Sequence, residues 1–188
     1  MLILGSSSPR RKEILSRTML KFRTVQIDFN EVFPDEGTIY EKVMSVALAK
    51  AKEIYKNQPS EDIVISADTI IYLEGEIFGK PKTSEDAFNM LMKLNNKSHS
   101  VITGVSIVTE GEEITFYEES FVTFKNNDVK EIEKYSQTRE VLDKAGSYAI
   151  QGFAVHFIEK YEGDYNNIMG LPLAHLCEKL RPFLNLDE

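Results

Sequence analysis

The order of apolar and polar positions predicts that the chain begins with a strand, a tight turn and a helix. Residues 1–5 form a short apolar run that ends in glycine, as expected of a buried strand. Ser8 suits a helix N-cap and Pro9 the first helical position, and apolar residues then recur at helical spacing through residues 14–19. We expect the first amide groups of this helix to point back at the turn formed by residues 6–8.

The next part of the chain predicts a strand, a helix and a hairpin. A second strand is expected at residues 22–27. Thr38 and Glu41 have the spacing of a capping box, which predicts a helix that ends near residues 57–59. Residues 62–73 are β-branched and almost continuously apolar, as in a buried strand, and the glycine-containing turn that follows them predicts a hairpin.

The second half of the chain predicts further helices and hairpins. In order, we expect a helix capped by Thr83 or Ser84, strands at residues 101–109 and 114–124, a helix from Asn127 or Asp128, segments at residues 153–161 and 165–169, and a helix from about Pro172. The segments at residues 153–161 and 165–169 flank a glycine turn and are interpreted as a further hairpin. Helices that alternate with several hairpins favour a mixed α/β fold, with a bent central sheet flanked by helices, over a purely parallel sheet.

Length and composition narrow the class of protein. A chain of 188 residues without an internal repeat or a linker is expected to form a single domain over residues 1–188, which can have two lobes. Hydrophobic residues make up 42% of it and charged residues 28%, a balance typical of globular proteins rather than disordered ones. Cys177 is the single cysteine, which excludes an internal disulfide, and no pattern of a signal peptide or membrane span is evident. We therefore expect a soluble, cytoplasmic protein that does not enter a membrane.

Charge is unevenly distributed along the chain. The net charge is −8, which disfavours nucleic acid as a partner because a polyanion would be repelled over most of the surface. Residues 1–23 nevertheless hold six basic side chains against one acidic side chain, a local charge of +5, so that the rest of the chain carries −13. The acidic protein thus has a basic N-terminal segment.

Residues 5–11, with the sequence Gly-Ser-Ser-Ser-Pro-Arg-Arg, join the first strand to the first helix. The segment combines amide groups at a helix N-terminus, serine hydroxyls and the guanidinium groups of Arg10 and Arg11, which together suit a polyphosphate. It is not a Walker loop, because no Gly-Lys-Ser/Thr follows the glycine at the required spacing. The alternative is a serine-rich helix cap beside two solvated arginines.

A carboxylate interrupts the longest predicted buried strand. Asp68 and Thr69 stand between the apolar runs at residues 63–67 and 70–71. An uncompensated buried charge costs several kcal/mol or is neutralised by protonation, so we expect Asp68 to face a cation, a metal or a cleft. The alternative is a structural aspartate that caps backbone amides.

Two further segments are candidates for the same site. Lys80 lies between Gly79 and Pro81 at the end of the predicted hairpin, where it would project into the same cleft, although such a tripeptide can also be an ordinary turn. Residues 143–152 are too polar for a core strand and too rich in glycine for a helix. Gln151 in this segment has both the donors and the acceptor needed to read a nucleobase edge, and the alternative is a plain surface loop.

The histidines and the cysteine do not form a recognisable site. His99, His156 and His175 lie far apart in the sequence without metal-ligand spacing, and Cys177 falls on a different helical face from His175. We interpret all four as structural. Because no nucleophile and base pair stands out either, a covalent mechanism is not supported.

Taken together, these segments resemble the Maf family of nucleotide pyrophosphatases nearly from end to end. The motifs that carry the resemblance are Ser6-Ser7-Ser8-Pro9-Arg10-Arg11, Leu48-Ala49 with Lys52, Ser66-Ala67-Asp68-Thr69, Gly79-Lys80-Pro81, Ser98-His99-Ser100-Val101 with Thr103-Gly104-Val105, Asp143-Lys144-Ala145-Gly146 through Ile150-Gln151-Gly152, and Gly170-Leu171-Pro172-Leu173. Each motif is short, but chance would rarely supply all seven in this order.

The resemblance implies a fold, a reaction and a set of site residues. The fold is similar to that of inosine triphosphate pyrophosphatases, with a cleft between two lobes, and the protein would tend to form a homodimer. The reaction is hydrolysis of a nucleoside triphosphate to the monophosphate and pyrophosphate with a divalent metal cation, Mg²⁺ or Mn²⁺. Asp68 resembles the proton acceptor that activates water, and Glu31 and Asp68 are the implied metal ligands. The implied phosphate contacts are Ser6, Arg10, Arg11, Lys52 and Lys80.

Within the family, the chain resembles the members that act on dTTP and UTP. Those members have arginine, threonine and glutamine where Arg10, Thr69 and Gln151 stand, whereas the subgroup that acts on 7-methyl-GTP differs at these places. The resemblance therefore implies a pyrimidine nucleotide, with modified pyrimidine nucleotides as further candidates and nucleotide-pool cleaning as the role. The alternatives are a non-catalytic nucleotide-binding regulator of cell division and a purine-directed pyrophosphatase of the 7-methyl-GTP type.

Overall fold

The computed structural model describes residues 1–184, which form two compact units built from interleaved segments. The first unit comprises Met1–Asp68, Thr103–Glu118 and the segment from Tyr165 onward. The second comprises Thr69–Ile102 and Glu119–Asp164. Three of the four boundaries fall within strands, and neither unit is one continuous piece of chain. A single domain over residues 1–188 stays a prediction.

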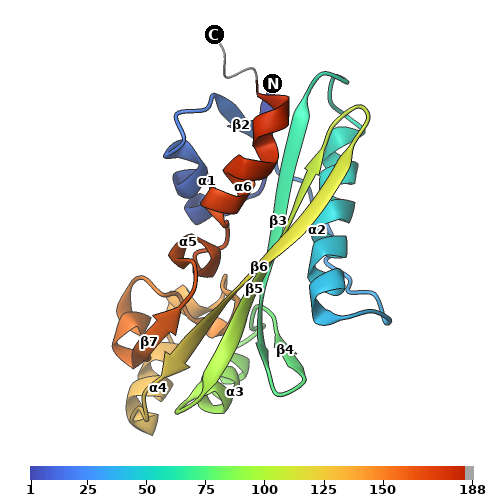
Figure 1. Cartoon of the computed structure of the whole chain (residues 1–188). Coiled ribbons are helices and arrows are strands. Elements are labelled where there is room, and N and C mark those ends of the chain that lie inside the picture. Colours follow the sequence, from blue (N-terminus) through green and yellow to red (C-terminus); the bar gives the residue numbers. More distant parts are fainter. Residues whose placement is uncertain (185–188) are drawn as a thin grey trace. The chain divides into compact units, whose positions relative to one another are not determined.

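Within residues 1–184, seven strands form one mixed sheet. They are β1 (Leu2–Gly5), β2 (Phe22–Thr24), β3 (Ile63–Leu73), β4 (Glu76–Phe78), β5 (Ser98–Val108), β6 (Glu113–Phe124) and β7 (Ile158–Glu162). Their order is β2-β1-β3-β5-β6-β7, and β4 pairs with β3 beside this path. β1 is parallel to β2 and β3, whereas β4 is antiparallel to β3 and β7 to β6. The mixed α/β fold class expected from the hairpins is confirmed, and the ribbon can be followed in Figure 1.

The first unit contains α1 (Pro9–Ser16), α2 (Ile39–Tyr55), α5 (Tyr165–Ile168), α6 (Leu173–Leu180) and the short 3₁₀ helix η4 (Arg181–Phe183). The expected capping box is present at α2, where the Thr38 hydroxyl accepts from the Glu41 amide and the Glu41 carboxylate accepts from the Thr38 amide. Buried residues of α2 pack on β1, β3 and β5 in a cluster of Ile3, Ala51, Ile54, Val64 and Val108. Burial of this apolar face holds α2 against the sheet.

Close approach of β5 to α2 requires a glycine. A Cβ atom placed on Gly104 would lie 2.7 Å from the carbonyl carbon and oxygen of Val43 and 2.8 Å from the amide nitrogen of Met44. Such contacts with the backbone of a helix cannot be relieved by a rotamer change. Gly104 therefore sets how closely α2 lies against the sheet.

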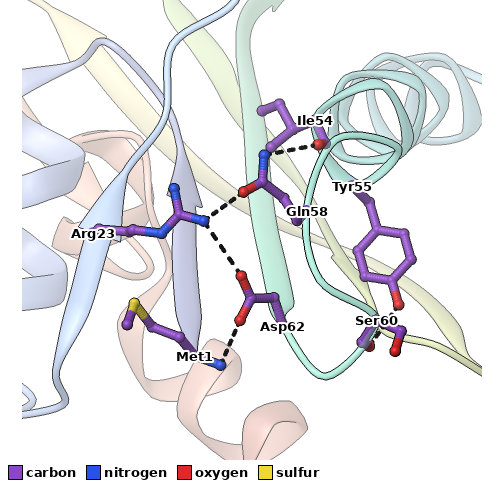
Figure 2. A network of polar contacts seen from close by, with 7 residues as sticks. All are labelled: Met1, Arg23, Ile54, Tyr55, Gln58, Ser60 and Asp62. Atoms are coloured by element: carbon purple, nitrogen blue, oxygen red, sulfur yellow. Dashed lines mark hydrogen bonds and ion pairs between the residues drawn. The ribbon is translucent and has the colours of Figure 1, made fainter.

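A polar network joins the starts of the first three strands in chain order to the end of α2 (Figure 2). The Met1 ammonium lies 2.7 Å from Asp62 Oδ1, and an Arg23 guanidinium nitrogen lies 3.3 Å from Asp62 Oδ2. Arg23 also donates to Gln58, whose amide donates to the carbonyl of Ile54 at 3.3 Å. Hydrogen bonding from the Met1 ammonium, the largest effect, and from Arg23 lowers the pKa of Asp62 below its ordinary value of 3.8.

The second unit contains α3 (Ser84–Leu94), α4 (Val129–Ser136) and the 3₁₀ helices η1 (Arg139–Val141), η2 (Ala145–Ser147) and η3 (Phe153–Phe157). Its core is aromatic: the Phe124 ring lies 4.8 Å from that of Tyr148 and 6.4 Å from that of Phe157, and the Tyr135 ring lies 5.3 Å from that of Phe157. In addition, the Asn95 side chain after α3 donates to the carbonyl of Asn127 before α4. No helix among the described residues combines the length and the apolar composition needed to cross a bilayer.

The predicted hairpin around residues 162–164 is wrong on both sides. Residues 165–168 form helix α5, in which Met169 donates to the Tyr165 carbonyl at 3.0 Å, and Gly170 ends the turn at φ 105°. On the other side only Ile158–Glu162 is a strand, because residues 153–157 form η3, with Ala154 and Phe157 buried three positions apart. In these short segments the backbone groups find local partners, so the sequence pattern alone does not distinguish a strand from a turn of helix.

The second strand is shorter than predicted. β2 ends at Thr24 rather than residue 27, although Val25 still donates to the carbonyl of Leu4 at 3.0 Å. Val25 and Ile27 are partly buried against the cluster beneath α2. Their apolar character therefore reflects packing rather than strand pairing.

Candidate functional site

The turn between β1 and α1 is built so that a helix N-terminus follows directly on a buried strand. Ser6 is buried, and its hydroxyl accepts from the amide of Ser8 at 3.1 Å. Ser8 is the N-cap of α1, as predicted, and Pro9 occupies the first turn. A Cβ atom on Gly5 would meet the Ile65 carbonyl oxygen at 3.3 Å, so glycine lets β1 end tightly against β3. The positive end of the α1 dipole thus faces the serine turn.

Arg11 connects four of the residues predicted from the sequence. Burial lowers the pKa of its guanidinium, and the negative charges of Asp68 and then Glu31 oppose this effect. The charge of Arg10 lowers the pKa of Arg11 further. Asp68, Glu31 and Arg10 are therefore each close enough to Arg11 to act on its charge, and all four residues belong to the first unit.

The guanidinium of Arg11 is oriented by a distant segment of chain. Its Nε atom donates to the carbonyl of Gly170 at 2.7 Å. Arg17, one and a half turns later in the chain, donates to the side chain of Asn166 at 3.1 Å. The segment around α5, which contains the Gly-Leu-Pro-Leu motif, therefore holds the arginine in place.

Asp68 lies just beyond the point where β1 and β3 separate. Gly5 pairs with Ser66 in the parallel register, and the Ser66 hydroxyl donates to the Gly5 carbonyl at 3.3 Å. Asp68 follows two residues later on the same face of β3, and only 7% of its surface is exposed. A carboxylate so buried needs a nearby positive charge, and Arg11 supplies one. Asp68 thus lies within electrostatic range of a cation, and its role in the reaction stays a prediction.

A lysine that sequence reasoning missed lies beside Glu31. The Lys50 Nζ atom is 3.8 Å from Glu31 Oε1, and only 13% of the Lys50 side chain is exposed. Lys52, the lysine implied by the family resemblance, lies 2.7 Å from Glu113 Oε1 with half of its side chain exposed. Helical positions two apart face different directions, so the two lysines cannot serve the same partner.

The apolar spacing of α2 could have identified Lys50 as a candidate site residue. It stands four residues after Val46, three after Ala47 and four before Ile54, and all three of those residues are buried. The charge of a lysine within the apolar stripe of an amphipathic helix needs a partner nearby. Such a lysine is therefore a stronger candidate for a binding site than a lysine on the exposed face. The role of Lys52 as a phosphate contact stays a prediction.

The carboxylates of the first unit fit a hard divalent cation. Asp68 and Glu31 both act on Arg11, and carboxylate oxygens are the protein ligands that Mg²⁺ prefers. Among residues 1–184, no group of three or more histidine, cysteine or acidic side chains is gathered closely enough to hold a metal. The role of Glu31 and Asp68 as metal ligands stays a prediction.

Three predicted residues belong to the second unit. Thr69 follows Asp68 in β3, is partly buried, and points to the opposite face of the strand. Lys80 is exposed just after β4, and Gln151 is exposed in the loop formed by residues 143–152. The amide of Gly146 in this loop donates to the carbonyl of Gly79 at 3.0 Å, so the segment carrying Lys80 is tied to the loop carrying Gln151.

His99 has the structural position expected for it. It is buried, its Nε2 atom lies 2.6 Å from the Tyr148 hydroxyl, and its ring meets that of Phe124 edge-on. Burial lowers the pKa of His99 to about 4, so the ring is neutral at pH 7. His175 pairs instead with Glu118 at 3.0 Å.

Comparison with known sequences adds a family assignment. A family model described as Maf-like protein matches residues 1–183. The chain is 46% identical over 184 residues to a dTTP/UTP pyrophosphatase of Acholeplasma laidlawii (strain PG-8A), covering 97% of this chain and 96% of the relative. It is 42% identical over 182 residues to a dTTP/UTP pyrophosphatase of Bacillus cereus (strain G9842), covering 97% and 95%.

Comparison with solved structures supports the fold. A HAM1 protein from Coxiella burnetii matches 96% of this chain and 98% of its own with a TM-score of 0.53. Only 14% of the aligned residues are identical, so this likeness concerns the fold alone. It agrees with the mixed α/β architecture.

Proposed function

Since this chain belongs to the Maf family, we propose that it is a nucleoside triphosphate pyrophosphatase that converts dTTP or UTP to the monophosphate and pyrophosphate. The observation that supports the proposal is that the charges of Asp68, Glu31 and Arg10 all act on Arg11, in the first turn of α1. Two arginines beside two carboxylates at a helix N-terminus supply cations for phosphates and oxygen ligands for a metal.

The substrate assignment rests on the relatives and on three side chains. Relatives 46% and 42% identical, matched over nearly their whole length, are named dTTP/UTP pyrophosphatases. This chain keeps Arg10, Thr69 and Gln151, the residue types that resemble the pyrimidine subgroup. Modified pyrimidine nucleotides are further candidate substrates, and their removal would clean the nucleotide pool.

The phosphate chain would be bound by cations of two kinds. The guanidinium of Arg11, oriented by Gly170, and that of Arg10 suit paired hydrogen bonds to phosphate oxygens. Ser6 and the first amides of α1 add neutral donors, and the family resemblance adds Lys80 as a further candidate cation. We add Lys50 to this set because it lies beside Glu31, and Lys52 remains a candidate.

Hydrolysis would proceed by direct attack of water. Asp68 would accept a proton from the water whose oxygen bonds to the α-phosphorus, while the bond to the bridging oxygen breaks and pyrophosphate leaves. Glu31 and Asp68 would hold Mg²⁺ or Mn²⁺, which when bound neutralises phosphate charge and polarises the phosphorus. This scheme needs no side-chain nucleophile, which agrees with the lack of a recognisable nucleophile and base pair in the sequence.

We further propose a homodimer in the cytoplasm. The family resemblance supports the homodimer, and a chain with a single cysteine suits a reducing compartment. The oligomeric state can be read from light scattering of the purified protein.

A substrate panel tests the proposed reaction. Purified protein with Mg²⁺ or Mn²⁺ is given each common nucleoside triphosphate and 7-methyl-GTP, and pyrophosphate and monophosphate are measured. We expect dTTP and UTP to give the highest kcat/KM. Preference for guanine nucleotides would instead identify a purine-directed enzyme, and nucleotide binding without pyrophosphate release would identify a non-catalytic regulator.

A further inference from the structure

The loop that carries Gln151 has unusual backbone geometry. Gln151 is exposed, and the next residue, Gly152, has φ 86° and ψ −153°, a conformation that side chains rarely permit. An exposed glutamine reads a base edge only if its backbone is held still, because a flexible side chain loses entropy on binding. The anchors of this loop are therefore relevant to substrate choice.

The side chain of Tyr135 contacts residues that flank the loop. Tyr135 lies in α4 and is buried, and its hydroxyl donates to Glu140 Oε1 at 3.2 Å. Its ring also lies nearly parallel to that of Phe153, two residues after Gln151, at 5.8 Å. A single side chain thus contacts Glu140, before the loop, and Phe153, directly after it.

The carboxylate of Glu140 occupies the space beside Gly152. A Cβ atom placed on Gly152 would lie 2.6 Å from Glu140 Oε1 and 3.2 Å from its carboxyl carbon. The backbone carbonyl of Glu140 accepts from Lys144 Nζ at 2.5 Å, which ties the start of the loop to the same residue. Glu140 therefore packs directly against the peptide that follows Gln151.

We propose that Tyr135 and Glu140 are positioning residues that hold Gln151 in place to read the nucleobase. This inference rests on the proposed function, because it assumes that Gln151 contacts the base. Neither side chain touches the nucleotide; each acts through the loop backbone. Tyr135 holds the Glu140 carboxylate and packs on Phe153, and Glu140 packs against Gly152, the residue after Gln151.

The test compares base preference among matched variants. The variants are Tyr135→Phe, Glu140→Ala, Glu140→Gln, Gln151→Ala and the double variant Tyr135→Phe with Gln151→Ala. Tyr55→Phe is the control, because it also removes one phenolic hydrogen bond, the 2.8 Å bond to the Ser60 carbonyl, but lies in the first unit. The measured quantity is the ratio of kcat/KM for dTTP to that for dGTP, at temperatures well below each melting temperature.

We expect Tyr135→Phe and Glu140→Ala to lower the ratio roughly tenfold, mainly through the KM for dTTP, because misplacement of a binding group weakens its contacts. Glu140→Gln keeps an oxygen that accepts from Tyr135 and should restore most of the preference. Adding Tyr135→Phe to Gln151→Ala should change the ratio no further, because the glutamine through which Tyr135 acts is gone. Tyr55→Phe should keep the wild-type ratio.

A binding assay separates failure of this inference from failure of the proposed reaction. Calorimetry with α,β-imido-dUTP and α,β-imido-dGTP reports base preference without turnover. If pyrophosphate is never released but the wild type prefers the dUTP analogue and the variants do not, the positioning role stands and the reaction is wrong. Three outcomes would each overturn the inference. They are a wild-type base preference in Tyr135→Phe and Glu140→Ala, additive effects in the double variant, and a wild type that shows no base preference.

Discussion

The side chain of Arg11 and the backbone carbonyl of Gly170 are joined by a 2.7 Å hydrogen bond across 159 positions of sequence. This bond fixes the plane of a guanidinium whose charge interacts with both Asp68 and Glu31. Arg11 is thus both a link between α1 and the segment before α6 and a member of the candidate site. An ammonium group lacks the planar set of donors of a guanidinium, so it cannot both bond to Gly170 and face the two carboxylates.

Arg11→Lys is expected to keep the positive charge but lose this geometry. The ammonium cannot donate to Gly170 along the Nε direction while also facing the two carboxylates, so kcat/KM should fall by roughly 100-fold. Steady-state kinetics measures the loss, and circular dichroism checks that the helices persist. Wild-type kcat/KM in this variant would mean that the oriented guanidinium has no part in catalysis.

Asp68→Asn should nearly abolish pyrophosphate release. The amide is isosteric with the carboxylate but cannot accept a proton from water, and loss of a general base costs about 10²–10⁴ in rate. The fold should persist because Glu31 remains as a negative charge acting on Arg11, but the melting temperature should fall, since the buried guanidinium loses one of its two opposite charges. Pyrophosphate release is followed in a coupled assay. Turnover at the wild-type rate would show that Asp68 takes no part in the reaction.

Lys50→Met and Lys52→Met form a matched pair on one helix. Lys50 is the lysine that lies beside Glu31, whereas Lys52 pairs with Glu113, so the larger rise in KM is expected in Lys50→Met. Methionine keeps the length of both side chains while removing the charge. The KM for dTTP is measured for both variants, and a larger effect at Lys52 would favour the family-derived assignment.

Gly104→Ala should destabilise the first unit. The added methyl group would lie 2.7 Å from the α2 backbone at Val43, and overpacking of this kind costs about 1–3 kcal/mol. Gly111→Ala is the control, because a Cβ atom there meets nothing within 4 Å. Urea unfolding should show a lower midpoint for Gly104→Ala only.

Acid should weaken the network around Asp62. Its pKa is lowered in the folded state by the Met1 ammonium and Arg23, so its contribution to stability is complete well above the ordinary value of 3.8 and is lost as pH falls through the lower folded-state pKa. Asp62→Asn should cost roughly 1–3 kcal/mol at pH 7 and less below pH 4. The free energy of unfolding, measured by urea at several pH values, tests this; an equal cost at all pH values would contradict it.

Several local features were predictable because their causes lie within a few residues. The capping box at Thr38, the Ser8 N-cap and the β3–β4 hairpin are present where the pattern placed them, and Thr83 is the N-cap of α3 among the two residues proposed for it. The helix caps depend on side chains that bond to backbone groups three positions away, and the hairpin depends on a turn at Glu74 and Gly75, both with positive φ. The hairpin expected at residues 162–164 failed because no local feature decides whether a four-residue segment pairs with another strand.

The sequence alone determined which residue types the chain has available for a polyphosphate: a serine turn at a helix N-terminus, two arginines and a carboxylate within a buried strand. Only the tertiary structure decided which of them meet. The β1–β3 register places Asp68 beside the start of α1, the helical phase of α2 turns Lys50 rather than Lys52 toward Glu31, and Gly170 orients Arg11. These relationships join residues far apart in the chain, so they depend on packing that no short window of sequence contains.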